Sequence, residues 1–222
     1  MNSRPGGGYA AATAWELEMS LLAPRRRPGG RNAAVRLGVA RAVLAFLEEG
    51  STDFGVSEVA ARAGVHRTTV HRRWPTRAAL LGEALALRYS AVTVPMTGSF
   101  AADLRALAHA MARYLAEPAQ RTVHGMALAA GGTGFTDLLR SYWLPLRRRM
   151  VLLVRSGIAS GQLRPDTDVD ALIQLLLGPL VMNLLFTRAA ATPRHVDIIT
   201  DAVLRAFLRN EAPASARPSR RP

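Results

Sequence analysis

The chain has 222 residues, of which 49% are hydrophobic, so it can bury the core of one sizeable domain or two small ones. Cysteine is absent, which excludes disulfides, thiolate catalysis and cysteine-ligated metals. The 29 basic residues, all arginine, outnumber 16 acidic ones and give a formal net charge of +13, which predicts an acidic partner such as nucleic acid or an anionic membrane surface. A GC-rich gene explains the choice of arginine over lysine equally well, but it does not explain the excess of base over acid.

The two ends of the chain have the composition of mobile arms. Residues 1–30 are rich in Gly, Pro and Arg, and they lack an apolar stretch long enough for a secretory signal. We therefore expect a flexible N-terminal arm on a cytoplasmic protein, in which 14–22 is the stretch that favours a short helix. Residues 212–222 predict a disordered tail.

Three helices are predicted to follow the arm. Apolar residues recur at helical spacing over 33–48, and Gly50 ends this helix. A second helix is predicted over 56–63, and Gly64 then supplies a tight turn into a third helix over 67–73. Two short helices joined by a glycine turn are the elements of a helix-turn-helix.

The remaining chain is helical in pattern as well. Thr76 is expected to cap a fourth helix that runs to Leu87 or beyond, and no segment shows convincing strand alternation. We therefore predict an all-α fold, with a helix-turn-helix module at 31–78 and a larger helical bundle at 79–211. The helices predicted in the bundle, separated by glycine- and proline-rich breaks, cover 101–116, 119–130, 135–157, 168–190 and 194–209.

The most apolar internal run, at 171–186, raises the question of a membrane span. It is shorter than the roughly 20 apolar residues that cross a bilayer, and it carries Gln174, Asn183 and a Gly-Pro pair. The sequence favours a buried helix here, and no membrane partner is expected.

The third predicted helix has two different sides. At about 100° per residue, Val70 and Trp74 share one side and can pack on the preceding helix. Thr68, Thr69 and Arg72 share the opposite side. A helix with an apolar back and a polar front of this kind can enter the major groove of DNA.

This polar front supplies the candidate DNA contacts. Arg72 can form a bidentate contact with guanine, and the threonines can contact phosphate or a thymine methyl group. For one such helix taken alone, a solvated basic face is the simpler interpretation, but the glycine turn and the Trp-Pro exit favour DNA binding. The candidate DNA-binding residues are Arg67, Thr68, Thr69, His71, Arg72, Arg73 and Arg77.

The helix-turn-helix segment resembles the tetracycline-repressor (TetR) family of one-component transcriptional regulators. The resemblance rests on ARAVLAFLEEG, which ends at Gly50, and on VSEVAARAGVHRTTVHRRWPTRAALL at 56–81. The chain departs from the family pattern where His71 stands in place of Tyr and Trp74 in place of Phe. Arg77 replaces a Lys, and His66 is a poorer N-cap than the usual small residue.

The resemblance implies a ligand-responsive regulator, in most cases a repressor. It implies an all-helical homodimer that binds a pseudo-palindromic double-stranded DNA operator and that a small apolar ligand releases. The last two long helices would form the dimer interface, although core packing alone also explains the width of their apolar stripes. The apolar stripes on these helices contain Leu172, Leu175, Leu176, Val181, Leu184 and Leu185, then Ile198, Ile199, Val203 and Phe207.

The ligand side has weaker signals. Aromatic residues and methionines in the middle helices can line an apolar cavity, with Tyr and Trp supplying polar groups. Ordinary core packing explains the same residues. The candidate ligand-binding residues are Met111, Tyr114, Met126, Phe135, Tyr142 and Trp143.

Enzymes are the rival class. The sequence shows no phosphate loop, paired-carboxylate motif, nucleophile elbow or metal-ligand spacing, so we expect neither catalysis nor a cofactor. The acidic residues Asp166, Asp168 and Asp170 precede a predicted helix and are interpreted as cap and dipole charges. A second rival is an architectural nucleic-acid-binding protein with weak sequence preference and no ligand.

Overall fold

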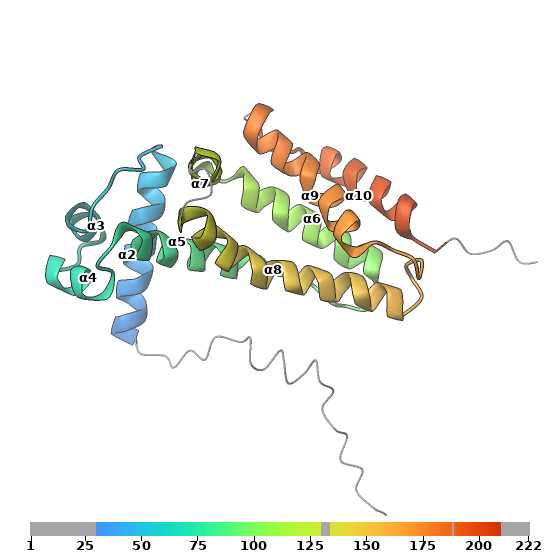
Figure 1. The fold of residues 1–222 in the computed structure, drawn as a ribbon, viewed down its shortest axis with the longest axis horizontal. Helices are drawn as coiled ribbons and strands as arrows, with labels where there is room; N and C mark the ends of the chain where they lie inside the picture. The colour runs from blue at the N-terminus through green and yellow to red at the C-terminus, as the bar shows by residue number, and fades with distance from the viewer. Residues whose placement is uncertain (1–29, 130–133, 188, 210–222) are drawn as a thin grey trace, which may run out of the picture. The chain divides into compact units, whose positions relative to one another are not determined.

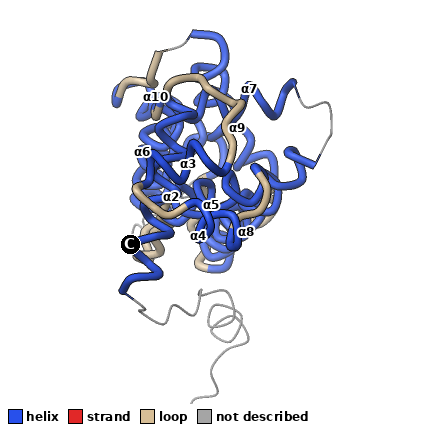
Figure 2. The backbone as a smooth tube through the Cα atoms, turned by 90° about the vertical axis from the view of Figure 1, so that its left-hand side faces the viewer, coloured by secondary structure: helices blue, strands red, loops and turns tan. Residues whose placement is uncertain are grey.

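The computed structural model describes residues 30–129, 134–187 and 189–209, which form helices joined by loops (Figures 1 and 2). Within them the one β feature is an isolated bridge between Leu163 and Leu208. The all-α prediction is therefore confirmed, whereas the predicted arm and tail lie outside the described residues. The helices are α2 (Gly30–Glu48), α3 (Val56–Ala63), α4 (Arg67–Arg73), α5 (Arg77–Ala91), α6 (Phe100–Ala116), α7 (Pro118–Ala129), α8 (Gly134–Ala159), α9 (Val169–Met182), the π-helix η1 (Asn183–Thr187) and α10 (Pro193–Phe207).

One predicted helix ends early. The sequence pattern predicts a helix over 168–190, but α-helical hydrogen bonding stops at Met182 and a π-helical segment carries the chain to Thr187. Ala189 and Ala190 are not helical. A π-helical turn contains more residues than an α-helical turn, but a five-residue segment is too short for its apolar periodicity to reveal the change.

Residues from Val35 onward form one compact unit that contains both the helix-turn-helix and the later bundle. The predicted module boundary at 78/79 falls in the first turn of α5, inside this unit. Two apolar clusters lie within it. One joins α2, α3, α4, the first half of α5 and α7, and the other joins α6, α8, α9 and α10.

Three valines lie at the centre of the helix-turn-helix core. Val43 of α2, Val59 of α3 and Val70 of α4 are fully buried. Gly64 ends α3 at φ +63°, a left-handed conformation that costs little only for glycine, and its N–H bonds back to the carbonyl oxygens of Ala60 and Ala61. This turn lets α3 and α4 pack on each other, side by side in Figure 1.

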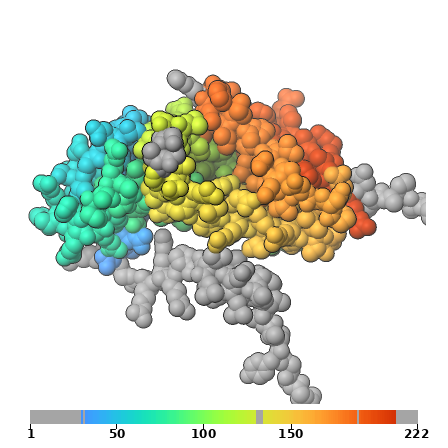
Figure 3. Space-filling model, in the orientation of Figure 1, coloured from blue at the N-terminus to red at the C-terminus, as the bar shows by residue number. Residues whose placement is uncertain are grey.

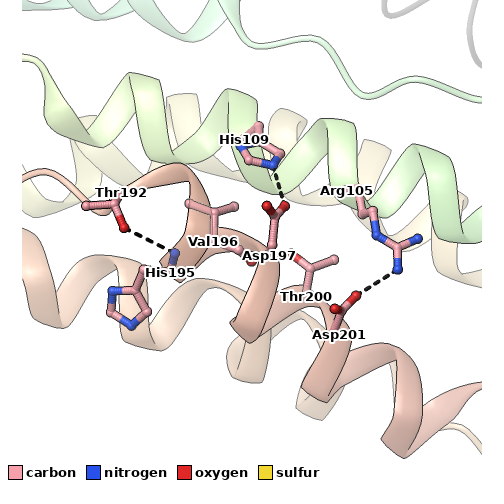
Figure 4. Close-up of polar contacts among 8 residues, drawn as sticks. All are labelled: Arg105, His109, Thr192, His195, Val196, Asp197, Thr200 and Asp201. Carbon is pink, nitrogen blue, oxygen red and sulfur yellow. Dashed lines mark hydrogen bonds and ion pairs between the residues drawn. The ribbon is translucent and has the colours of Figure 1, made fainter.

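Polar contacts as well as apolar ones fix α10 on α6 (Figure 4). His109 Nε2 lies 2.8 Å from Asp197 Oδ1, and Arg105 Nη2 donates to Asp201 Oδ1 at 2.7 Å. Between these pairs the two helices bury apolar side chains against each other. Because both pairs are partly exposed, we expect the apolar contact to provide most of the stabilisation.

The packing of α8 on the start of α6 leaves no room for a larger residue at Gly157. A Cβ there would lie 2.7 Å from Cδ2 of the buried Phe100 ring. Gly157→Ala should therefore destabilise the fold by about 1 to 3 kcal/mol in urea-induced unfolding. Gly125→Ala in α7, where nothing lies within 4 Å of the new methyl group, should be neutral or stabilising. Equal effects at both sites would contradict the close packing of α8.

Candidate DNA interface and ligand cavity

Helix α4 has the two sides that its sequence predicts. Val70 is 0% exposed and Trp74 is 4% exposed, whereas Thr68 and Arg72 are exposed and Thr69 is half-buried. Trp74 stands at the C-terminal cap, where its backbone N–H donates to the Val70 carbonyl oxygen. The polar side of α4 is therefore free to meet another molecule.

The start of α4 is capped poorly, as the sequence indicates. The side chain of the N-cap residue His66 does not bond to the helix backbone. Its Nδ1 instead lies 2.8 Å from the hydroxyl of Thr68, one of the candidate DNA contacts. The structure thus places an imidazole beside the first turn, where exposed N–H groups and the helix dipole favour an anion.

The basic candidates surround this first turn and the end of α4. Arg67, His71, Arg72 and Arg73 are all exposed, and the guanidinium of Arg73 lies 5.2 Å from the Trp74 ring centroid. Arg77, at the start of α5, donates from Nη1 to the Thr52 carbonyl oxygen at 2.9 Å and lies 3.4 Å from Asp53 Oδ1. All seven DNA-binding candidates thus come from α4 and the first residue of α5.

A carboxylate that the sequence analysis did not select holds the end of α4 in place. Glu83 of α5 accepts a bond from Arg36 Nε of α2 at 2.7 Å and from the indole Nε1 of Trp74 at 3.2 Å. The Glu83 side chain is only 15% exposed. A phenylalanine at position 74 would have no N–H to donate, so this contact depends on the chain's departure from the family pattern. The sequence did offer one signal for this contact, because Glu83 is an isolated acidic residue within the apolar run of α5.

The neighbouring residue of α5 faces the later bundle. An ideal Cβ on Gly82 would lie 3.1 Å from the hydroxyl oxygen of Tyr142 of α8. Burial raises the pKa of Tyr142, and the charge of Glu83 raises it further, while Arg36 opposes this effect. α5 is therefore in contact with the recognition helix on one side and with α8 on another.

A cavity of about 970 Å³ lies among α5, α6, α7, α8 and α9. Three of the six predicted ligand-binding residues line it: Met111, Tyr114 and Trp143. Apolar atoms supply most of the surface of its wall. The full lining comprises Tyr89, Met111, Tyr114, Leu115, His124, Thr136, Leu139, Arg140, Trp143, Leu144, Arg147, Asp170, Ile173, Gln174, Leu177, Gly178 and Val181.

The other three predicted ligand residues lie elsewhere. Met126, Phe135 and Tyr142 do not line this cavity but pack, partly buried, against the apolar cluster of the helix-turn-helix. Successive helical residues point about 100° apart, so neighbours such as Tyr142 and Trp143 serve different cores. Residue type alone did not distinguish these two directions.

The charged and polar residues of the cavity wall were mostly missed as well. Arg147 is ion-paired with Asp170, which links α8 to α9 at the cavity wall. Asp168 caps α9 as predicted, because its side chain accepts from the backbone N–H groups of Asp170 and Ala171. His124 Nδ1 lies 2.8 Å from the Gln120 carbonyl oxygen, and burial lowers the pKa of this histidine.

Part of the apolar surface on the last helices stays uncovered. In Figure 3, α9 and η1 appear in orange on the face shown. Leu175 is 53%, Met182 56% and Phe186 71% exposed along one side of this segment, and Ile198 of α10 is 54% exposed. Most of the predicted stripe is instead used inside the chain, because α9 and α10 pack on α6 and α8. The residues buried in this way are Leu172, Leu176, Leu184, Ile199, Val203 and Phe207.

Comparison with known proteins identifies both parts of the chain. The model of bacterial regulatory proteins of the tetR family matches residues 37–84, and the model of the tetracyclin repressor-like C-terminal domain matches residues 94–203. The chain is 30% identical over 154 residues to the HTH-type transcriptional regulator AqdR of Rhodococcus erythropolis, covering 68% of this chain and 74% of AqdR. It is 29% identical over 166 residues to the uncharacterized HTH-type regulator YdeS of Bacillus subtilis, covering 73% and 82%.

Solved structures show the same fold. The TetR family transcription regulator SCO0332 superposes with a TM-score of 0.62 at 27% identity, over 77% of this chain and 97% of that one. A TetR transcriptional regulator from Agrobacterium tumefaciens gives a TM-score of 0.65 at 22% identity, over 78% and 94%. The chain therefore belongs to the TetR family and is a helix-turn-helix transcriptional regulator. Its domains and relatives are those of regulators rather than enzymes.

The hydrogen bond from Trp74 to Glu83 can be tested by a double-mutant cycle. Trp74→Phe keeps an aromatic ring but removes the donated N–H, and Glu83→Leu removes the acceptor. In urea-induced unfolding we expect the two substitutions to be coupled by about 1 kcal/mol. The same cycle with Trp143→Phe should be additive, because Trp143 lines the cavity instead. Additive effects for Trp74 would mean that its ring serves only through packing.

Proposed function

We propose that the chain is a ligand-responsive one-component repressor. It binds a pseudo-palindromic operator as a homodimer, and a small, largely apolar ligand in the cavity releases it. The single observation that carries this proposal is the outward polar side of α4, next to its buried Val70 and Trp74 anchors.

The charges around α4 support DNA as the partner. Arg67, Arg72 and Arg73 are exposed on one short helix, and their planar guanidinium groups suit both phosphates and guanine edges. Arg77 stands at the start of α5, where a phosphate would also meet the helix dipole. In such a complex α4 would read bases, and Arg77 would position the protein on the backbone.

The uncovered apolar side of α9, η1 and α10 supports the homodimer. The segment Val169–Thr187 is long and apolar enough to cross a membrane by length and composition, and 33% of it is buried. It nevertheless packs on α6, α8 and α10, and it keeps exposed apolar residues, as does α10 at Ile198. A second copy would cover this side and bring two recognition helices to one operator.

The cavity supports ligand control. Its volume of about 970 Å³ is in the range of drug-sized ligand sites, and its wall is mainly apolar. Tyr89 of α5 lines the cavity, and Glu83 of α5 accepts the hydrogen bond from Trp74, so one helix contacts both sites. A ligand that prefers one arrangement of α5 shifts the balance by its difference in affinity for the two states.

Arg72 and Arg77 should differ in their effects on DNA binding. With an operator obtained by selection from random duplexes, Arg72→Ala should weaken binding by about 1 to 3 kcal/mol and relax specificity at one base pair. Arg77→Ala should weaken binding to all sequences alike and make binding less dependent on salt. Shift assays on operator and scrambled duplex over a range of salt measure both effects.

Arg155→Ala is the matched control for both arginines, since Arg155 is exposed near the end of α8. A wild-type protein that binds operator and scrambled duplex equally well would contradict the regulator proposal and favour an architectural role. Equal losses on all sequences for Arg72→Ala would make Arg72 a phosphate contact.

Charge on the uncovered apolar side should break the homodimer. Phe186→Glu would place a carboxylate in the interface, and a central contact of this kind is worth about 2 kcal/mol or more. Sedimentation velocity should show a dimer for the wild type and a monomer for Phe186→Glu, with loss of operator binding. Leu128→Glu in α7, where Leu128 is 70% exposed, is the control and should stay dimeric. A dimeric Phe186→Glu variant would place the interface elsewhere.

A further inference from the structure

The cavity contains polar atoms that have no hydrogen-bond partner among the described residues. The hydroxyl oxygens of Tyr114 and Thr136 are buried with no described partner in hydrogen-bonding geometry, and both residues line the cavity. Tyr89 and Gln120 lie close enough to the Tyr114 hydroxyl to affect its pKa. Tyr114 as a whole is only 8% exposed. An unpaired buried hydroxyl is costly, and native proteins satisfy such groups with water or ligand.

Further polar groups lie beside Tyr114. The buried side-chain oxygen Oε1 of Gln120 also lacks a partner among the described residues. Nδ1 of His124 must donate to the Gln120 carbonyl oxygen, because a carbonyl only accepts. Nε2 of the neutral imidazole is then an acceptor. The cavity wall therefore offers the hydroxyl groups of Tyr114 and Thr136 and a neutral imidazole, and Gln120 lies close to Tyr114 outside the wall.

The charges at the cavity are either compensated or in water. Arg147 is paired with Asp170, and Arg140 is exposed. Burial raises the pKa of Tyr114 and lowers that of His124, so both groups are uncharged at neutral pH. Arg88, whose charge reaches Tyr114, is ion-paired with Glu117. A buried anion would therefore lose its hydration and meet only cations that are already paired or exposed, which is unfavourable.

The remaining wall sets the shape of the ligand. Trp143 and Tyr89 supply aromatic surface, and Met111, Ile173 and Leu177 supply flexible and branched aliphatic surface. These groups attract flat or extended hydrocarbon frames through area burial and ring contacts.

We propose that the cavity binds a neutral, mainly apolar molecule that carries a carbonyl or hydroxyl oxygen, and that Tyr114 hydrogen-bonds this oxygen with support from Thr136. The proposal rests on the ligand-responsive function proposed above. It assigns recognition to two hydroxyl groups in the interior and excludes carboxylates from it.

Three probes on one frame test this assignment. They are 2-acetylanthracene, 2-ethylanthracene and anthracene-2-carboxylate, which share the flat hydrocarbon and differ in a carbonyl, a methylene or an anion. Their dissociation constants are measured with the full chain by quenching of tryptophan emission. Trp143→Phe identifies the part of the quenching that arises in the cavity. We expect the ketone to bind about tenfold more tightly than the ethyl compound, and the carboxylate to bind most weakly.

Tyr114→Phe should remove most of the ketone's advantage over the ethyl compound. Tyr142→Phe is the matched control and should keep that advantage, because Tyr142 does not line the cavity. Tyr114→Phe should not destabilise the ligand-free chain in urea-induced unfolding, because the hydroxyl it removes is buried without a partner in hydrogen-bonding geometry. Thr136→Val should reduce the advantage by a smaller factor.

The possible failures are distinguishable. If ketone and ethyl compound bind equally, if the carboxylate binds most tightly, or if Tyr114→Phe keeps the full preference, the ligand class is wrong while the cavity still binds apolar molecules. If none of the three probes binds, the ligand-responsive function itself is contradicted.

Discussion

The burial of Val70 and Trp74 decides which side of α4 faces outward. A helix of two turns has little intrinsic stability, so its orientation must come from packing on α3 and on the start of α5. Glu83 then ties the indole of Trp74 to Arg36 of α2 by two short contacts. The outward threonines and arginines are positioned only because these inward groups leave α4 a single way to lie.

α5 connects this arrangement to the rest of the molecule. Its Leu80 and Leu81 are buried in the helix-turn-helix core, Gly82 allows Tyr142 of α8 to approach, and Tyr89 reaches the cavity. Close-packed cores respond to a small displacement by changing between discrete arrangements rather than by bending smoothly. A ligand that moves the cavity wall therefore has a short physical route to α4, through one helix and its neighbours.

The apolar surface of α9, η1 and α10 is partly buried within the chain and partly exposed. Leu172 and Leu176 close the core of the chain, whereas Leu175 and Phe186 remain at the surface. The same segment thus has the mean hydropathy of a membrane helix while part of it is a core helix. In the proposed homodimer, a second copy of the chain would cover the remainder and would also supply the second recognition helix that a pseudo-palindrome needs.

The sequence by itself determined the local structure of this protein. Helical periodicity, the turn at Gly64, the cap at Thr76 and the two-sided pattern around Val70 depend on neighbours within a few residues, and the structure agrees with each of them. Only the tertiary structure decided which side chains meet across long separations in the chain. It joined Glu83 to Trp74 and Arg36, and it turned Trp143 toward the cavity but Tyr142 toward the other core. Local patterns fix the phase of a helix, but the choice between two apolar cores depends on how whole helices pack, which no short stretch of sequence encodes.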